Sequence, residues 1–380
     1  MNKILKKVYF PNLNGIRFLA AFLVIIHHIE QIKSLLGLNS RWDNPFVKLI
    51  GPLGVILFFV LSGFLITYLL LVEENQTKTI AVKSFYIRRI LRIWPVYYLL
   101  IGLSFFLFSR ISILNLGEWS EHIFDNLALK LIMFILFLPN LALILFSPIP
   151  YASQTWSVGV EEQFYLIWPV LMKKVKNKKM LLYVIVLGYL AIKWVGFRFI
   201  QKFIFWNTNM ETIKSFFDSF SIDCMAIGGL FAVYLYNKDK ILNVLFSKYV
   251  QVIIYTLLVV LIAKGIKLPY IHFEFYAILF GVMIVNLAAN ANSFLRLENK
   301  LFHYLGKISY GLYMYHPIAI VLALKILAAF GIVNIWIEYV SIIVVSIIIA
   351  GFSYKYFESY FIDKKLKFSK IITGDNAKFD

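Results

Sequence analysis

The stretch that decides the fold covers residues 14–30, NGIRFLAAFLVIIHHIE, an apolar run with Arg17 near its start and His27 and His28 well inside it. A helix of about 20 apolar residues spans the hydrocarbon core of a bilayer, so the run predicts a membrane helix. An ionisable side chain in that core costs on the order of 3 kcal/mol on insertion scales, and such residues are usually functional. The same run therefore also predicts part of a functional site.

The rest of the chain repeats this composition. It has 380 residues, of which 61% are hydrophobic and 15% charged, whereas soluble domains average about 45–50% apolar and about 25% charged residues. The apolar segments are continuous rather than alternating, which favours helices over a membrane barrel. We predict an all-α polytopic membrane protein, a bundle of about ten transmembrane helices near residues 16–34, 51–72, 94–109, 155–172, 180–197, 216–236, 249–264, 271–291, 308–330 and 335–356.

One further apolar stretch, residues 129–147, is interrupted by Pro139 and Asn140. If it crossed the membrane, the next helix would deliver the run KKVKNKK, residues 173–179, to the outer side. If it does not cross, the inner side holds 26 of the 38 Lys and Arg residues, the bias that marks cytoplasmic loops. We therefore predict a re-entrant or interfacial segment there, with both termini cytoplasmic.

Domain organisation and charge narrow the class further. We expect one integral membrane domain over residues 1–357 and a short basic cytoplasmic tail over residues 358–380. The net charge of +18 is explained by inner loops, so no nucleic-acid partner is expected. The single cysteine, Cys224, cannot form an internal disulfide, and no metal-ligand spacing is present, so no metal is expected.

Helical geometry separates the two histidines of the opening run. Arg17 and His28 are eleven residues apart, close to three turns, so they share one helix face, while His27 points about 100° away. At about 1.5 Å per residue, His28 lies about 16 Å deeper than Arg17. The alternative is that Arg17 extends to the membrane interface and the histidines form hydrogen bonds in the core.

The stretch QTWSVGVEEQFYLIWPVL, residues 154–171, places Glu161 and Glu162 inside a predicted crossing. Two adjacent glutamates cannot both face lipid, so at least one meets a cavity or a partner. A histidine with a carboxylate is a common general-base arrangement, so one of these two glutamates is a candidate partner for His28. The alternative places the glutamates at the interface within a belt of aromatic residues.

Two more groups of polar residues are candidates for a site. His316 precedes Pro317, and a core histidine bonded to the carbonyl that the proline frees is the alternative to a functional one. Arg88, Arg89 and Arg92 lie on a predicted short amphipathic helix ended by Pro95. Arg89 and Arg92 share a face and suit phosphate groups, although a topogenic loop or a site for anionic lipid is equally compatible.

The neighbouring residues Gly228 and Gly229 are predicted to permit close helix packing. They carry no chemistry of their own.

Five stretches, in order along the chain, resemble the motifs of the acyltransferase-3 family of integral membrane enzymes. NGIRFLAAFLVIIHH resembles the opening motif, whose histidine falls on His28 rather than His27. The others are LFFVLSGFLIT, FYIRRILRIWPVYY with Arg89 and Arg92, TWSVGVEEQFYLIWP with Glu161, and SYGLYMYHPI ending on His316. One departure is FESYF, where Tyr360 replaces the proline that often follows Glu358 in the family, so the conformation of the tail cannot be carried over. The chain looks like a stand-alone member without an appended Ser-Gly-Asn-His hydrolase-like domain.

The resemblance implies a membrane O-acyltransferase of the bacterial cytoplasmic (inner) membrane. It would move an acyl group, usually acetyl, from acetyl-CoA or another acyl-CoA to a hydroxyl of a cell-envelope glycan or lipid-linked glycan. The implied catalytic residues are His28, Glu161 and His316, and the implied acyl-CoA-binding residues are Arg17, Arg89 and Arg92. Direct transfer with His28 as general base and an acyl-histidine relay are both compatible with these residues.

Two other functions remain open from the sequence. One is a transporter or flippase that uses the intramembrane His, Glu and Arg residues as a proton relay, and the other is a non-catalytic membrane scaffold. The acceptor, the length of the acyl group and the oligomeric state are not determined by the sequence.

Overall fold

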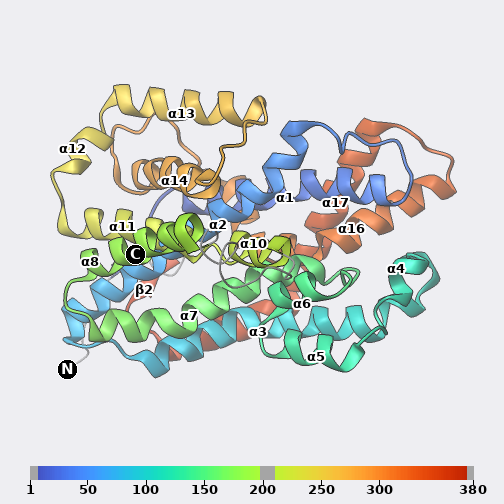
Figure 1. Ribbon diagram of the computed structural model, residues 1–380, viewed down its shortest axis with the longest axis horizontal. Helices are drawn as coiled ribbons and strands as arrows, with labels where there is room; N and C mark the ends of the chain where they lie inside the picture. Colours follow the sequence, from blue (N-terminus) through green and yellow to red (C-terminus); the bar gives the residue numbers. More distant parts are fainter. Residues whose placement is uncertain (1–6, 197–209, 375–380) are drawn as a thin grey trace.

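The computed structural model describes residues 7–196 and 210–374, which form a helical bundle with its long helices side by side (Figure 1). The first half contains β1 (Lys7–Val8), α1 (Leu13–Leu35), α2 (Pro45–Thr77), α3 (Val82–Phe106), α4 (Glu118–Glu121), α5 (Leu127–Ile135), α6 (Pro139–Leu145), α7 (Trp156–Lys174) and α8 (Lys178–Ala191). The second half contains α10 (Met210–Ser219), α11 (Ile222–Asn237), α12 (Ile241–Leu245), α13 (Lys248–Ala263), α14 (His272–Ala289), α15 (Lys300–Lys307), α16 (Ser309–Ala329), α17 (Ile335–Ser353), α18 (Ser359–Lys365) and β2 (Ile372–Thr373).

Seven of the described helical stretches are long and apolar enough to cross a bilayer, so the chain is an all-α multi-pass membrane protein. They are Leu13–Leu35, Pro45–Thr77, Val82–Arg110, Ser215–Asn237, His272–Ala289, Ser309–Ala329 and Ile335–Phe368. The other three expected crossings form α7, α8 and α13, which are shorter or more polar. The expected number of about ten crossings stays a prediction. Residue 197, the end of the expected helix 180–197, and residues 375–380 of the expected tail lie outside the described residues.

Helix α2 is the centre of the bundle and packs against α1, α7, α11 and α14. The contact with α11 is close because glycines face it from both sides. A Cβ atom on Gly63 would lie 1.9 Å from the carbonyl oxygen of Met225, and one on Gly228 would lie 2.0 Å from that of Val60. The prediction that the Gly228–Gly229 pair permits close helix packing is confirmed.

Residues 129–147 form two short helices, α5 and α6, rather than one helix of crossing length. The chain breaks between them at Phe137, whose φ of 57° is left-handed, and Pro139 starts the second helix. The side chain of Gln163 on α7 holds the break by donating to the carbonyl of Phe137 at 2.7 Å and to Asn140 at 3.0 Å. A broken helix fits the expected re-entrant or interfacial segment, and whether the segment crosses stays a prediction.

Helix α3 corrects one expectation. Pro95 does not end a short amphipathic helix, because α3 runs without interruption from Val82 to Phe106. A proline leaves the carbonyl four residues earlier without its helical partner, but membrane helices tolerate such a residue where neighbouring helices pack against it. Helices α7, α16 and α18 all pack against α3. Arg88, Arg89 and Arg92 are therefore carried on the same rigid helix as the crossing segment.

The segment after α17 folds back onto the bundle. Helix α17 continues through a π-helical turn, Tyr354–Glu358, into α18, and Tyr360, which stands where the family often has proline, lies within α18. Beyond α18, β2 pairs in parallel with β1, with Lys7 opposite Ile372 and Val8 opposite Thr373. The described part of the expected basic tail thus packs on the membrane domain.

Candidate active site

A cavity of about 350 Å³ lies where α1, α2, α3, α7 and α16 meet the segment that follows α17. This volume is at the lower end of the range for small-molecule sites, about 300–1,000 Å³. Its described lining is rich in charge and carries more cations than carboxylates. The cations are Arg17, Arg89, Arg92, Lys307 and Lys365, and the carboxylates are Glu161, Glu358 and Asp363.

The three arginines expected to bind the donor all line this cavity. The guanidinium of Arg17 donates to Asn14 Oδ1 at 2.7 Å. That of Arg89 lies 5.4 Å from the ring centre of Tyr165 and 5.3 Å from that of Phe85, so aromatic faces hold it in place. Within the described part of the chain, neither Arg89 nor Arg92 forms an ion pair, and Arg89 Nε is buried without a hydrogen-bond partner. Such a surplus of buried positive charge suits an anionic ligand.

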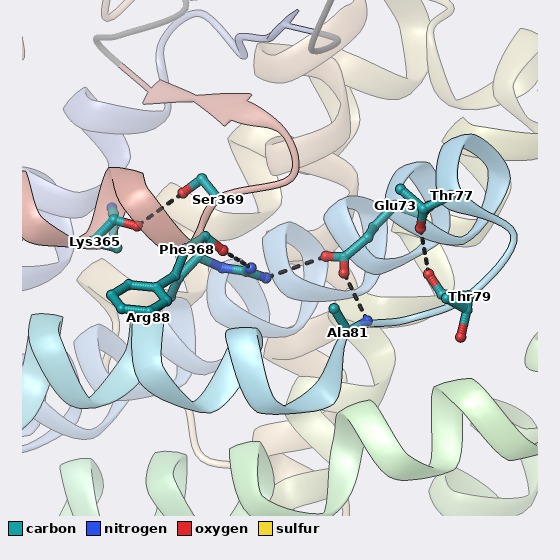
Figure 2. Close-up of polar contacts among 8 residues, drawn as sticks. All are labelled: Glu73, Thr77, Thr79, Ala81, Arg88, Lys365, Phe368 and Ser369. Carbon is teal, nitrogen blue, oxygen red and sulfur yellow. Dashed lines mark hydrogen bonds and ion pairs between the residues drawn. The ribbon is translucent and has the colours of Figure 1, made fainter. Parts of the chain in front are cut away.

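Arg88, the neighbour of Arg89, has a different environment. It forms an ion pair with Glu73 of α2 at 3.3 Å and donates to the carbonyl of Phe368 at 2.9 Å. Figure 2 shows its guanidinium between these two partners, and Arg88 is not among the residues that line the cavity. The basic cluster read from the sequence therefore divides into two arginines that line the cavity and one that joins three parts of the fold.

Glu161 and Glu162 are also separated. Glu161 lines the cavity, where it accepts hydrogen bonds from Ser62 at 3.0 Å and Tyr165 at 2.9 Å. Glu162 lies outside the lining and accepts from the indole of Trp94 at 2.9 Å. Neither carboxylate is bonded to His28, so the structure does not bring the expected pair of Glu161 and His28 into direct contact.

His28 lies against His316 instead. Their ring centres are 4.8 Å apart, although 288 residues separate them in the chain. His28 Nδ1 lies 2.9 Å from the carbonyl of Val24, and His316 Nδ1 lies 2.7 Å from that of Tyr313. A carbonyl only accepts hydrogen bonds, so Nδ1 of each ring carries the proton and Nε2 presents its lone pair in the neutral form. Each ring is thus held in the tautomer that a base requires.

The alternative role for His316, a core histidine bonded to the carbonyl that Pro317 frees, explains the partner of one of its two ring nitrogens. Tyr313 is four residues before Pro317, so its carbonyl is the one that the proline frees, and His316 Nδ1 takes it up. His316 Nε2 is buried and has no hydrogen-bond partner among the described residues. An unpaired buried acceptor costs on the order of 1–3 kcal/mol, so His316 stays a candidate for a functional residue.

His27 belongs to a third environment. Its Nδ1 lies 2.8 Å from the carbonyl of Val47, and its ring lies 5.0 Å from that of Trp42. A Cβ atom on Gly51 would lie 2.2 Å from the His27 ring, so this glycine allows the ring to pack directly on α2. His27 therefore serves the contact between α1 and α2.

Neither His28 nor His316 lines the cavity, and Tyr313 connects the two regions. Tyr313 lines the cavity while its ring lies 5.9 Å from that of His316. Its hydroxyl donates to the carbonyl of Gln154 at 2.9 Å and accepts from Ser157 at 2.6 Å. The site thus has a cationic cavity and a histidine pair, with Tyr313 between them.

Several residues of this arrangement were not identified from the sequence. Ser62 and Tyr313 lie within the motifs quoted above, so a role could have been suspected. Glu358, buried and bonded to Ser353 at 3.0 Å, lies in the motif of the family that departs at Tyr360. Lys365 lies in no motif, and only the folding of α18 onto α3 brings it to the cavity.

The residues that could hold an anionic cofactor are the cations of the cavity. Among residues 7–196 and 210–374, no group of three or more His, Cys, Asp and Glu residues is placed to bind a metal ion. The expectation of no metal stays a prediction.

Comparisons with known proteins identify the family of the chain. A family model described as an acyltransferase domain matches residues 10–355. The peptidoglycan O-acetyltransferase OatA of Listeria monocytogenes is 26% identical over 376 residues, which cover 92% of this chain and 55% of that protein. No solved structure matches the chain.

Two shorter matches are closer in sequence. A Staphylococcus aureus protein provisionally named an O-acetyltransferase is 33% identical over 45% of this chain and 26% of its own length. A Bacillus subtilis protein provisionally named a peptidoglycan O-acetyltransferase, YrhL, is 32% identical over 43% of this chain and 23% of its own. The chain spans about half the length, or less, of these curated relatives. Because the family model covers nearly all of it, the chain belongs to the acyltransferase-3 family of integral membrane acyltransferases.

Proposed function

We propose that the protein is a membrane O-acetyltransferase that moves an acetyl group from acetyl-CoA to a hydroxyl of a cell-envelope glycan or glycan precursor. The observation that carries the proposal is the juxtaposition of a cavity in which Arg89 and Arg92 form no ion pair within the described residues and a pair of histidines whose Nδ1 atoms are bonded to carbonyls. The names of the relatives support acetyl as the acyl group and peptidoglycan as an example of the acceptor.

The cavity is assigned to the donor. Acyl-CoA carries several phosphate groups, and Arg89 and Arg92 form no ion pair within the described residues, although Glu161, Glu358 and Asp363 line the same cavity. Guanidinium forms bidentate charged hydrogen bonds with phosphate. Arg17 adds a third cation on α1, the helix that also carries His28. This assignment places the cavity mouth on the cytoplasmic side of a bacterial inner membrane, with ten crossings and both termini cytoplasmic.

The histidine pair is assigned to the chemistry. His28 Nε2 accepts the proton of the acceptor hydroxyl. The hydroxyl oxygen forms a bond to the acyl carbon, and the carbon–sulfur bond of the thioester breaks. The proton then passes from His28 to the departing thiolate, so the products are an ester and free CoA. General-base catalysis of this kind contributes about 10²–10⁴-fold. His316 acts as the neighbour that orients the His28 ring.

Tyr313 separates the donor from the base in this scheme. Since its hydroxyl is held by Ser157 and Gln154, this pair of hydrogen bonds has to open before the thioester can reach His28. Glu161 is held by Ser62 and Tyr165 on the cavity side of Tyr313, where it shapes the donor cavity and does not orient the imidazole.

The test compares His28→Ala with His27→Ala, two changes at neighbouring positions with different roles. Membranes that contain each variant are supplied with acetyl-CoA labelled in the acetyl group, and labelled ester on envelope glycans and released CoA are measured. We expect His28→Ala to lose about 10²–10⁴-fold in transfer while its binding of CoA and its abundance are unchanged. His27→Ala is expected to reduce abundance through lost packing rather than transfer per folded molecule.

Two outcomes would change the proposal. Retained transfer by His28→Ala would remove the base assignment. A labelled acetyl group found on the protein after a rapid acid quench, and lost in His28→Ala, would replace direct transfer by an acyl-histidine relay. A transporter would leave no acetyl ester on any product, so the same assay distinguishes that function.

A further inference from the structure

Residues 359–374, here called the tail segment, contribute to the cavity wall. They comprise α18, one 3₁₀ turn and β2. Both α18 and the 3₁₀ turn pack against α3, the helix that carries Arg89 and Arg92. Ile362, Asp363 and Lys365 line the cavity. The tail segment is therefore placed to take part in whatever the cavity binds.

Two sets of contacts fix the tail segment in this position. Arg88 of α3 donates to the carbonyl of Phe368 while it pairs with Glu73 of α2, and Glu73 in turn accepts from the backbone N–H of Ala81 at 2.9 Å. Figure 2 shows this chain of contacts from the α2–α3 turn to the tail segment. Further along, Ile371 is buried against Val8 and Val72, next to the pairing of β2 with β1.

Lys365 is the residue that these contacts bring to the cavity. Four guanidinium groups act on its ammonium, those of Arg92, Arg89, Arg17 and Arg88. Its ammonium forms no ion pair within the described residues. Like charges in a partly buried position repel one another, so the fold holds Lys365 against this repulsion. An arrangement of this kind is stabilised when a polyanion enters among the cations.

We propose that Lys365 is a donor-binding residue, and that the tail segment completes the donor site by adding its ammonium to the guanidinium groups of Arg89 and Arg92. This inference rests on the proposed function, because it takes the polyanion to be the phosphate-bearing part of acyl-CoA. An anionic lipid headgroup offers the same phosphate chemistry, so the test has an arm for each.

The test exploits a matched pair of adjacent lysines. Lys364 is exposed, lies outside the cavity lining and donates to the hydroxyl of Tyr360 at 2.6 Å. Full-length Lys365→Gln, Lys364→Gln and Lys365→Arg are purified in detergent with the unaltered protein. The affinity for CoA is measured by calorimetry, and thermal unfolding is recorded as the control for folding.

We expect Lys365→Gln to weaken CoA binding about tenfold, the effect of one charged hydrogen bond to phosphate. Lys364→Gln should match the unaltered protein, and Lys365→Arg should keep most of the affinity because it keeps the charge. Removal of the ammonium should leave the unfolding temperature of Lys365→Gln unchanged or higher, since repulsion among the cations is relieved.

This inference would be overturned if Lys365→Gln and Lys364→Gln bound CoA with equal affinity while the unaltered protein bound it normally. The assignment of the cavity to the donor would not be affected. Failure of the unaltered protein to bind CoA would overturn the donor assignment and this inference together. In the lipid arm, the variants are reconstituted in nanodiscs with and without phosphatidylglycerol. A loss of phosphatidylglycerol retention by Lys365→Gln without a change in CoA affinity would overturn it in favour of a lipid site.

Discussion

Cationic side chains near the two ends of α1 have different environments. Near the end of the helix, Lys33 meets Glu338 of α17 at 2.6 Å, with both side chains nearly inaccessible to solvent. Near its start, Arg17 lines a cavity in which Arg89 and Arg92 have no ion-pair partner in the described chain. Removing a charge from water costs several kcal/mol, which supports the proposal that an anionic ligand binds in the second arrangement.

The same difference recurs elsewhere. Lys193 is paired with Glu274 at 2.8 Å, so it is a buried lysine with a carboxylate partner, as Lys33 is. On α3 the two kinds of cation are adjacent residues, since Arg88 is paired with Glu73 while Arg89 faces the cavity. Burial of a cation alone therefore does not indicate a function. The partners of the cation have to be known as well.

The largest effect is expected from Glu338→Ala at the paired end. It leaves the Lys33 ammonium buried without a counter-ion, and breaking a buried pair in this way costs about 3–5 kcal/mol. Thermal unfolding of the purified protein would measure the loss. The double variant Lys33→Met/Glu338→Leu should recover much of it, and the CoA affinity of the folded protein should not change. If Glu338→Ala lost less than about 1 kcal/mol in the free energy of unfolding, the value of an exposed pair, the Lys33–Glu338 pair would not be needed to neutralise a buried charge.

Arg89→Gln, in the cavity, should affect ligand binding rather than stability. We expect CoA binding to weaken about 10- to 100-fold, since charged hydrogen bonds contribute about 1.5–3 kcal/mol, with no loss of thermal stability. Lys83→Gln, an exposed change on the same helix, is the matched control for both calorimetry and unfolding. Unchanged CoA affinity in Arg89→Gln would show that the unpaired cations do not hold the donor.

Arg88→Gln should give the smallest change of the three in stability or CoA affinity, and it tests whether Arg88 and Arg89 have different roles. It removes an ion pair that is also largely buried and one hydrogen bond to the tail segment. Because Glu73 keeps the hydrogen bond from the backbone N–H of Ala81, we expect a loss of only about 1 kcal/mol in stability. Cleavage by a protease within residues 366–374 should become faster. CoA affinity should fall no further than in Lys365→Gln. A loss as large as that of Arg89→Gln would place Arg88 in the donor site.

The features that were predicted from the sequence are local ones. Long apolar runs became α1, α2, α14 and α16, because a helix satisfies its own backbone groups in lipid wherever the run is long enough. Pro139 marked the break within residues 129–147, and the Gly228–Gly229 pair marked a close helix contact. The ordered motifs identified the family, and Arg17, Arg89, Arg92 and Glu161 all reach one cavity.

Proline was a poor guide where neighbours could compensate for it. Pro95 was expected to end a helix and instead lies within α3, since the packing of α7, α16 and α18 outweighs one missing hydrogen bond. The number of crossings was also not settled by hydropathy, because α7, α8 and α13 carry more polar residues or fewer turns than the seven clear spans.

Helical period and composition determine which segments are helices and which residues share a face of one helix, because these depend on neighbours in the chain. Partners between segments are decided by the tertiary structure alone. It sets His28 beside His316 rather than Glu161, pairs Arg88 with Glu73, and brings Arg89 and Lys365 to the same cavity. The physical reason is that a charge or a lone pair acts over a few ångströms, and only packing determines which groups come within that range.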